Sequence, residues 1–330
     1  LLIADGSSAM TSTRRRTLVA LLAALAIVPV VYATTGCNVV RLQQGRLESR
    51  MKEAGLVEHV EPLGDATVRF WDGGKGPVVL FVHGFGAEAV WQWTDQVEAF
   101  AGAHRVIVPD LLWFGGSSST ERDYSLEHQV RMLVALLDKL GEKQRIDVVG
   151  ISYGGFAAYE LAARHPDRVR NLVIVDSPGC AYQRSDYDAM LQRFGVARSS
   201  DLFVPSDEAG VAKLMDLAYA DPPWTPAFAR QQVLAGLYSQ WREEKKLLLE
   251  SLVQSMASGT DCSAAPRIPT LVVWGRDDGV FPLALGERLA AGLGPTARLV
   301  VIDHARHAPN LEHPKQFNEL IRTFLDGARP

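Results

Sequence analysis

The stretch IDVVGISYGGF, residues 146–156, decides the fold. Its first residues are mostly apolar and β-branched, which favours a strand buried on both faces. The pattern G-x-S-x-G follows, and a helical pattern then covers Tyr153 to His165. A side chain at Gly150 or Gly154 would collide in so tight a turn. The stretch therefore predicts a strand–turn–helix unit that lifts the Ser152 hydroxyl clear of a sheet, beside a helix N-terminus that favours a developing anion.

Short apolar runs of the same kind recur along the chain and predict further buried strands. They cover Pro77–Val82, Arg105–Pro109, Val169–Asp176, Thr270–Gly275 and Ala297–Asp303. Thr67–Trp71 predicts an antiparallel edge strand, and helical patterns at Ser125–Leu140 and from Phe317 to Leu325 lie between or after the strands. Alternating strands and helices favour an α/β fold with a mostly parallel sheet and helices on both faces.

The alternation stops between Asp176 and Thr270. Roughly ninety residues are too many for a simple connection, and the segment is helix-like, with Trp224 and Trp241 within it. We expect an inserted helical cap over residues 179–266. The core then consists of residues 67–178 and 267–330.

A second glycine-rich turn, His83-Gly84-Phe85-Gly86, follows the first buried strand. With this segment the sequence, over about residues 67–330, resembles the α/β-hydrolase superfamily, in particular its capped, monoacylglycerol lipase-like serine esterases. The resemblance implies an oxyanion hole built from the backbone N–H groups of Phe85 and Tyr153. It gives His83 a structural role.

The acid of a catalytic triad is expected after the strand Thr270–Gly275. The segment Trp274–Pro282 resembles the family pattern G-x-x-D-x-x-x-P, whose spacing selects Asp278. Asp277 is the near alternative for the acid. If Asp278 is the acid, Asp277 is expected to be a solvated loop residue. Asp176 is the distant alternative, because it ends another buried strand where some lipases of this fold carry their acid.

The base is expected after the last strand. The segment 307–314 resembles the family pattern H-x-P-x-x-E-x-P, which selects His307. His304 lies too close to the strand end, and His313 fits the start of a helix. The family usually has glycine before its histidine, and here the residue is Arg306. The order Ser152, Asp278, His307 agrees with the superfamily.

The turn Pro109–Ser117 resembles another family segment, P-D-x-x-G-x-G-x-S, made bulkier by Trp113 and Phe114. These aromatic side chains either line the substrate pocket or pack beneath the cap.

The sequence thus predicts a serine hydrolase that cleaves carboxylic esters, including lipid esters, through an acyl-enzyme. The first alternative is hydrolysis of a carbon–carbon bond in a ring-cleavage product, which relatives with the same triad perform. An alternative of another class is a non-catalytic ligand-binding protein on the same fold. Three cysteines without a CxxC or HExxH pattern predict no metal site, and no organic cofactor is implied.

The N-terminal segment reads as a targeting signal. Met10 and Arg14–Arg16 precede an apolar run from Leu18 to Ala33, which is shorter than the ~20 residues of a spanning helix. The segment ending in Gly36-Cys37 resembles a lipoprotein lipobox, which implies lipidation at Cys37. Signal peptidase cleavage nearby and an uncleaved anchor are the alternatives. All three predict export, on the periplasmic side of a bacterial membrane, with residues 1–36 as extension and signal and 37–66 as a linker.

Composition limits the partners of this 330-residue chain. A net charge of −4 gives no electrostatic footprint for nucleic acid. Without residues 1–36, which hold three arginines and one aspartate, the net charge is −6. Attachment to an anionic membrane must therefore come from the N-terminus or from apolar surface.

The two remaining cysteines lie near the points where the cap leaves and rejoins the core. Because the two stalks of an inserted unit share one edge of the sheet, and because export leads to an oxidising compartment, a Cys180–Cys262 disulfide is one hypothesis. The other is two unrelated small side chains.

Overall fold

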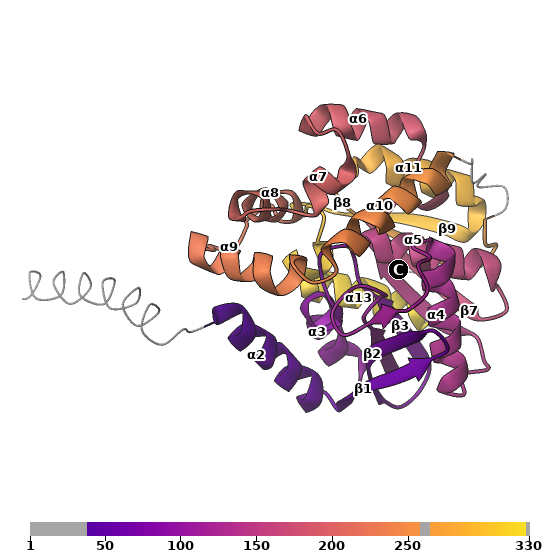
Figure 1. Cartoon of the computed structure of the whole chain (residues 1–330). Coiled ribbons are helices and arrows are strands. Elements are labelled where there is room, and N and C mark those ends of the chain that lie inside the picture. Colours follow the sequence, from indigo (N-terminus) through magenta and orange to yellow (C-terminus); the bar gives the residue numbers. More distant parts are fainter. Residues whose placement is uncertain (1–37, 258–264, 328–330) are drawn as a thin grey trace, which may run out of the picture. The chain divides into compact units, whose positions relative to one another are not determined.

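A nine-stranded sheet crosses the molecule, with the order β1-β2-β4-β3-β6-β7-β8-β9 and with β5 paired to β2 (Figure 1). This computed structural model describes residues 38–257 and 265–327. The strands are β1 (Leu56–Leu63), β2 (Ala66–Gly74), β3 (Val78–Val82), β4 (Arg105–Pro109), β5 (Ser118–Ser119), β6 (Ile146–Ile151), β7 (Val169–Val175), β8 (Thr270–Gly275) and β9 (Ala297–Ile302). All neighbours from β4 to β9 pair in parallel, which confirms the predicted fold class.

Helices cover both faces of the sheet, because alternate residues of each central strand point to opposite sides. From β3, Val79 and Phe81 pack into one core and Leu80 and Val82 into the other. The first core includes α3 (Ala89–Phe100) and α13 (Pro314–Leu325). The second includes α4 (Leu126–Lys139), α5 (Ser152–Arg164) and α11 (Leu283–Leu293).

The predicted linker over 37–66 is wrong for most of its length. Residues 39–53 form helix α2 (Val39–Glu53), which buries Leu47 and Met51 in the first core. Strand β1 then pairs antiparallel with all of β2 from Leu56↔Gly73 to Leu63↔Ala66. The strand expected at the edge, β2, is therefore interior and β1 is the edge. The three buried apolar side chains of α2, Val40, Leu47 and Met51, stand among mostly polar residues, which is too weak a pattern to mark a core helix.

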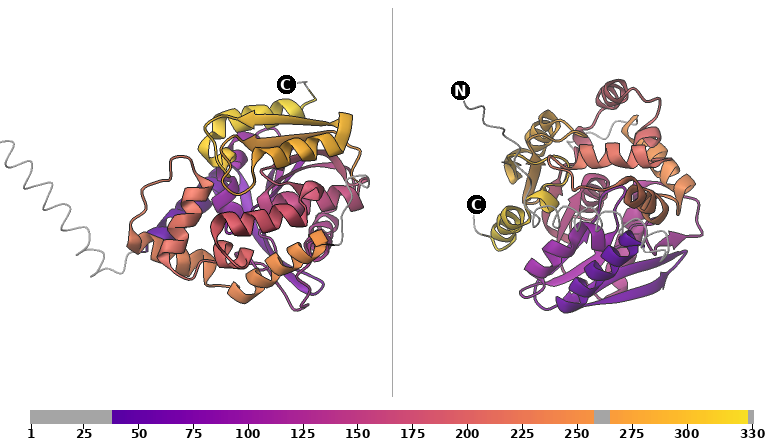
Figure 2. Two further views of the ribbon diagram at one scale, coloured as in Figure 1. Left: turned by 90° about the horizontal axis from the view of Figure 1, so that it is seen from above. Right: turned by 90° about the vertical axis from the view of Figure 1, so that its left-hand side faces the viewer.

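The predicted cap contains no strand in its described residues, 179–257 and 265–266. Its elements are η1 (Gly179–Ala181), α6 (Arg184–Phe194), α7 (Ser199–Phe203), α8 (Glu208–Ala218), α9 (Ala227–Val233), η2 (Leu234–Tyr238) and α10 (Arg242–Ala257). Figure 2 shows these helices gathered on one side of the sheet. They cover the carboxyl ends of the parallel strands, where ligands bind in α/β folds.

Two predictions fall outside the described residues. Cys37 and the apolar run before it lie there, and among residues 38–257 and 265–327 no helix is long and apolar enough to span a membrane. Cys180 takes part in a disulfide. Its partner is not a described residue, so the pairing with Cys262 stays a prediction.

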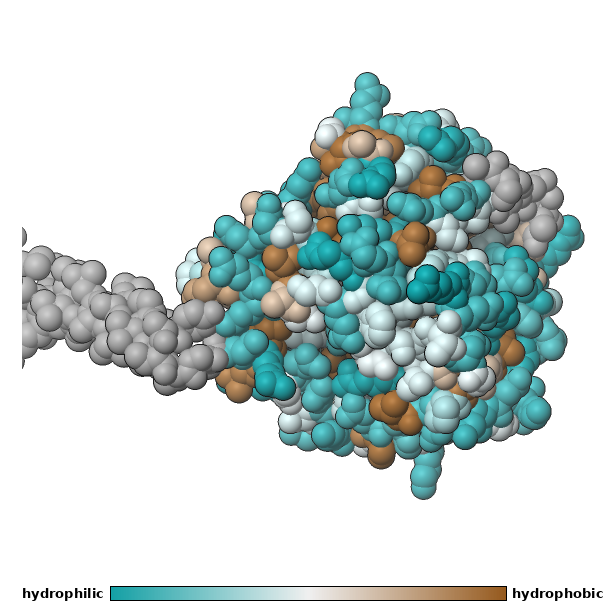
Figure 3. All heavy atoms as spheres, in the orientation of Figure 1, coloured by the Kyte–Doolittle hydropathy of each residue, from teal (hydrophilic) through white to brown (hydrophobic). Residues whose placement is uncertain are grey.

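The surface is mostly hydrophilic on the face shown in Figure 3, with apolar residues in separate patches. Among the described residues, Trp224 stands out because it is 88% exposed, on the loop between α8 and α9.

Candidate active site

Ser152 occupies a strained turn between β6 and α5. Its φ is 53°, a left-handed value that a serine adopts only where the surroundings enforce it. A Cβ at Gly150 would lie 2.3 Å from the Gly154 carbonyl oxygen, and a Cβ at Gly154 would lie 2.3 Å from that of His83. The two glycines are therefore required, as the sequence predicts, and the turn holds the serine above the sheet edge.

The three predicted catalytic side chains form one hydrogen-bonded chain. The Nε2 atom of His307 lies 2.8 Å from Ser152 Oγ. The Nδ1 atom of His307 lies 2.9 Å from Asp278 Oδ2 and 3.1 Å from Oδ1. Because a carboxylate only accepts, Nδ1 carries the proton and Nε2 accepts from the serine hydroxyl. The arrangement prepares Ser152 to lose its proton to His307.

Asp278 is fixed by its own loop. Its side chain is fully buried. Its Oδ1 accepts from the backbone N–H of Val280 at 2.7 Å and of Phe281 at 3.1 Å. These bonds stabilise the ionised carboxylate and aim it at the imidazole.

The alternative acid and base residues near Asp278 and His307 in the sequence take no part in these hydrogen bonds. Asp277 is exposed. The ring of His313 lies 3.0 Å from the His304 carbonyl oxygen, and His304 itself lies on a turn with φ 56°. The distant alternative, Asp176, is fully buried next to the site, where its Oδ1 accepts from the Gly275 N–H at 2.8 Å.

The His83–Gly86 turn lies directly against the serine. A Cβ at Gly84 would lie 3.3 Å from the Cβ of Ser152. His83 donates from Nδ1 to the Gly84 carbonyl oxygen at 2.8 Å, and its Nε2 accepts from the Leu111 N–H at 2.9 Å. Burial lowers the pKa of His83, which keeps the ring neutral in this role. The residue pins the turn to the segment after β4, which agrees with a structural role.

The two predicted oxyanion donors flank Ser152 in space. Phe85 lies within the His83–Gly86 turn, and both Phe85 and Tyr153 line the cavity at the serine. Tyr153 is the second residue of α5, and the first four N–H groups of a helix have no partner within it. Its N–H is therefore free to face a developing anion.

Trp113 and Phe114 are buried and are absent from the residues that line the cavity. Trp113 packs against the rings of Tyr124 and His128, whereas Phe114 lies beneath the cap. The Phe114 ring lies 5.3 Å from that of Phe85 and 5.2 Å from the ammonium of Lys245 on α10. Lys245 also donates to the carbonyl oxygens of Leu237, at 2.6 Å, and of Gln240, at 3.0 Å. Phe114 thus packs against both the oxyanion turn, at Phe85, and the cap, at Lys245.

A narrow cavity of about 50 Å³ opens at Ser152. Core and cap supply its walls, which are almost entirely apolar or aromatic. Besides the serine and the two oxyanion residues they are Phe156, Tyr182, Tyr187, Met190, Ser199, Phe203, Leu249, Leu252, Val253, Val280 and Phe281. Sequence reasoning missed the cap residues in this set, because α6, α7 and α10 are far from the triad in sequence.

A second cavity of about 250 Å³ adjoins the first. Phe156, Tyr182 and Leu252 line both, so these three side chains form a partition between them. The second cavity is more polar, with Glu127, Glu160 and Arg164 on its wall.

Arg306, which replaces the usual glycine, fastens the cap beside the catalytic histidine. Its guanidinium donates to the Asp216 carbonyl oxygen on α8. Its backbone N–H donates to Glu312 Oε1 at 2.7 Å, and Glu312 Oε2 accepts from the Ala220 N–H at 2.6 Å. The departure from the family pattern therefore adds a contact between core and cap.

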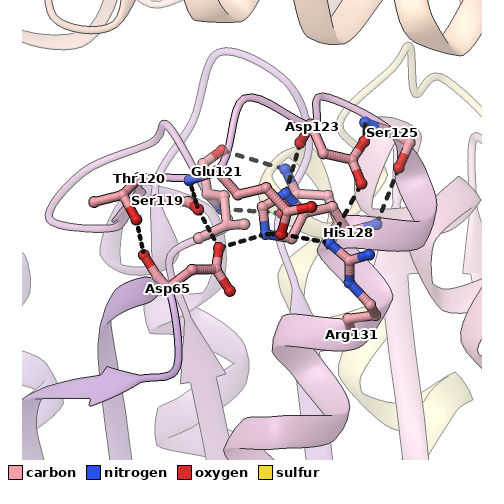
Figure 4. A network of polar contacts seen from close by, with 10 residues as sticks. Asp65, Ser119, Thr120, Glu121, Asp123, Ser125, His128 and Arg131 are labelled. Carbon is pink, nitrogen blue, oxygen red and sulfur yellow. Dashed lines mark hydrogen bonds and ion pairs between the residues drawn. The ribbon is translucent and has the colours of Figure 1, made fainter.

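One group of described side chains lies close enough to hold a metal ion: Asp65, Glu121 and His128 (Figure 4). His128 faces an acceptor at each nitrogen, the Asp123 carbonyl oxygen at 2.6 Å and Asp65 Oδ2 at 3.1 Å. Arg131 donates to Glu121 at 2.9 Å. These groups satisfy one another and tie the β1–β2 turn to α4, away from the triad.

A sequence profile of the α/β hydrolase fold matches residues 77–314. The chain therefore belongs to the α/β-hydrolase superfamily and is a hydrolase of that fold. The matched region begins at β3 and ends at the start of α13, so it includes the triad, the oxyanion turn and the cap.

Individual relatives have different activities. 2-Hydroxymuconate semialdehyde hydrolase of Pseudomonas putida is 32% identical over 265 residues, which cover 78% of this chain and 90% of the relative. Lipase 3 of a Moraxella species is 26% identical, with 78% and 80% covered. The crystal structure of a membrane phospholipase A, a bacterial virulence factor, superimposes with a TM-score of 0.74 at 24% identity, covering 95% of this chain and 98% of that one. The last likeness concerns the fold alone.

Proposed function

We propose that the protein is a serine esterase that hydrolyses neutral carboxylic esters with an apolar acyl group. The observation that carries this proposal is the hydrogen-bonded chain from Asp278 through His307 to Ser152, at the mouth of an apolar cavity. Ser152 Oγ attacks the ester carbonyl carbon while His307 Nε2 takes the hydroxyl proton. Asp278 stabilises the imidazolium that results.

The negative charge of the tetrahedral intermediate falls on the former carbonyl oxygen. The backbone N–H groups of Phe85 and Tyr153 donate to it, and preformed donors of this kind are worth ~3–4 kcal/mol each in comparable hydrolases. His307 returns its proton to the leaving alcohol, which leaves Ser152 acylated. Water, deprotonated by His307, then attacks the acyl carbon; the bond to Ser152 Oγ breaks, His307 returns the proton to this oxygen, and the carboxylic acid leaves.

The cavity favours an ester over a ring-cleavage acid. Its lining contains no Lys, Arg or His among the described residues. A buried carboxylate needs a cationic or hydrogen-bonding partner to offset its desolvation. The apolar and aromatic walls of this cavity instead suit an acyl chain. The second cavity beyond the partition is more polar, but Phe156, Tyr159, Tyr182 and Leu252 on its wall give a longer chain, as in a lipid ester, a surface to follow.

Carbon–carbon bond hydrolysis is the second candidate. It is favoured by the 32% identity with 2-hydroxymuconate semialdehyde hydrolase. The same triad could serve it.

The test compares substrates on one enzyme preparation. Purified protein is reacted with a fluorophosphonate probe and assayed with p-nitrophenyl esters of increasing acyl length and with a dienoate ring-cleavage product. We expect labelling at Ser152 and a higher kcat/KM for esters of medium or long chains. Preference for the dienoate would favour the second candidate, and the absence of both labelling and turnover would favour a binding protein.

We also propose export and attachment to a bacterial membrane through Cys37. The support is the sequence of residues 14–37 alone. A palmitate analogue supplied to cells should label the wild type and leave Cys37→Ser unlabelled. Equal labelling of both would refute lipidation at this cysteine.

A further inference from the structure

Asp176 is a buried carboxyl group that the mechanism above does not use. It follows β7, whose register with β8 places Val175 opposite Val273. Its backbone N–H donates to the Val273 carbonyl oxygen at 3.0 Å, and its φ is 42°. The strained turn brings its side chain to the same sheet edge as the Asp278 loop. Strain of this kind persists only where the surroundings enforce it.

The two oxygens of Asp176 differ. Oδ1 accepts from the Gly275 N–H at 2.8 Å. Oδ2 is buried and has no donor among the described residues. Asp278 follows the neighbouring strand β8, three residues after Gly275, and its carboxylate raises the pKa of Asp176 through its charge and a side-chain hydrogen bond. Two ionised carboxylates in contact in a dry site repel each other strongly, so one of them holds a proton.

The surrounding donors decide which one. Asp278 receives two backbone N–H groups and the His307 imidazole, all of which favour its ionised form. Asp176 receives one backbone N–H. We propose that Asp176 is a positioning residue of the triad: its Oδ2 carries a proton and donates a hydrogen bond to the Asp278 carboxylate. This inference rests on the proposed function of the same site.

The charges around Asp176 agree with this assignment. Burial, the charge of Asp278 and that of Glu312 all raise the pKa of Asp176, while the bond from Gly275 lowers it, and the pKa ends well above its usual range. A neutral donor holds the acid of the triad without adding a second negative charge.

Two substitutions separate the donor from mere packing. Asp176→Asn keeps an oxygen for the Gly275 N–H and offers an N–H to Asp278. Asp176→Leu has a similar volume and offers neither. The rate of fluorophosphonate labelling of Ser152 reads the assembly of the triad without an assumed substrate.

We expect Asp176→Asn to label within about threefold of the wild-type rate and Asp176→Leu about 10²-fold more slowly, as displaced catalytic groups do. A fall of about 10⁴-fold in Asp176→Asn would overturn the proposal, because that is the effect of removing an ionised triad acid. A wild-type rate in Asp176→Leu would overturn it too.

Infrared spectroscopy without substrate reads the proton directly. At pH 7 the wild type should show the C=O stretch of a protonated carboxylic acid that Asp176→Asn lacks. The control is Asp147→Asn, at another buried strand aspartate, whose carboxylate accepts from Arg170 and Asn171, and this variant should keep the acid band. An unchanged acid band in Asp176→Asn would refute the proton. If the wild type resists the fluorophosphonate, the proposed function fails, and the infrared result still decides the state of Asp176. The infrared measurement also decides whether Asp176 carries a proton if Asp176→Leu does not fold.

Discussion

The two walls of the active-site cavity are built in different ways. The core wall positions Ser152, Asp278 and His307 at strand ends by hydrogen bonds between 2.7 and 3.1 Å. The cap wall, from α6, α7 and α10, presents apolar and aromatic side chains such as Met190, Phe203 and Leu252. Hydrogen bonds are directional, whereas apolar packing tolerates changes of shape. The core wall therefore sets the chemistry and the cap wall sets which substrate fits.

The largest expected difference in kcat is between two serine-to-alanine variants, one on each wall of the cavity. Ser152→Ala should lower the esterase kcat by about 10⁴-fold or more, because no nucleophile remains. Ser199→Ala, in the cap lining, should stay within about threefold of wild type. Circular dichroism and thermal unfolding should show both variants folded. Near-full activity in Ser152→Ala would move the nucleophile elsewhere.

The next comparison lies within the core wall. Asp278→Asn should lower kcat by about 10⁴-fold, because the histidine loses the acceptor that sets its tautomer. Its exposed neighbour provides the matched control, and Asp277→Asn should change kcat by less than about threefold. The reverse ranking would shift the acid by one position.

The cap wall should respond in specificity. Leu252→Ala removes part of the partition between the two cavities, so kcat/KM for long-chain p-nitrophenyl esters should rise relative to short-chain ones by about tenfold, a scale typical of apolar pockets. Leu247 lies on the same helix but is 39% exposed, and Leu247→Ala should leave the chain-length profile unchanged. An identical profile in both variants would show that Leu252 does not limit the chain.

The smallest expected effect concerns stability at the junction of the walls. Burial and the charge of Asp110, partly offset by Arg69 and Lys245, raise the pKa of Glu88 from 4.5 to about 7. The folded state thus binds this proton more tightly than the unfolded state. The contribution to stability is complete below pH 4.5 and is lost as the pH rises through 7.

Glu88→Gln has no such proton to lose. Measured by urea unfolding, its free energy of unfolding should rise relative to that of the wild type between pH 4.5 and 7. A constant difference across that range would show that Glu88 does not titrate as its burial implies.

Much of the core could be predicted from sequence, because its signals are local. Short runs rich in β-branched residues, such as Val169–Asp176 and Thr270–Gly275, favour buried strands, and the glycines around Ser152 follow from steric contact in one turn. Spacing within short segments also selected Asp278 and His307. The apolar pattern was too weak to mark α2 and β1 as parts of the core. Strand β1 pairs with the next strand, β2, whereas the contacts of α2 with Asp95 and Glu98 are to α3, about 45 residues further along the chain.

The sequence by itself determined the fold class, the strand-end position of each catalytic residue and the presence of a helical insertion. Only the tertiary structure showed that Asp176 lies next to Asp278, that Arg306 joins the core to the cap, and that Leu252 lines both cavities. The physical reason for this division is that the spacing of apolar residues and the steric limits of a turn depend on residues close together in the chain. Proximity between residues about a hundred positions apart, such as Asp176 and Asp278, depends instead on the order and register of parallel strands.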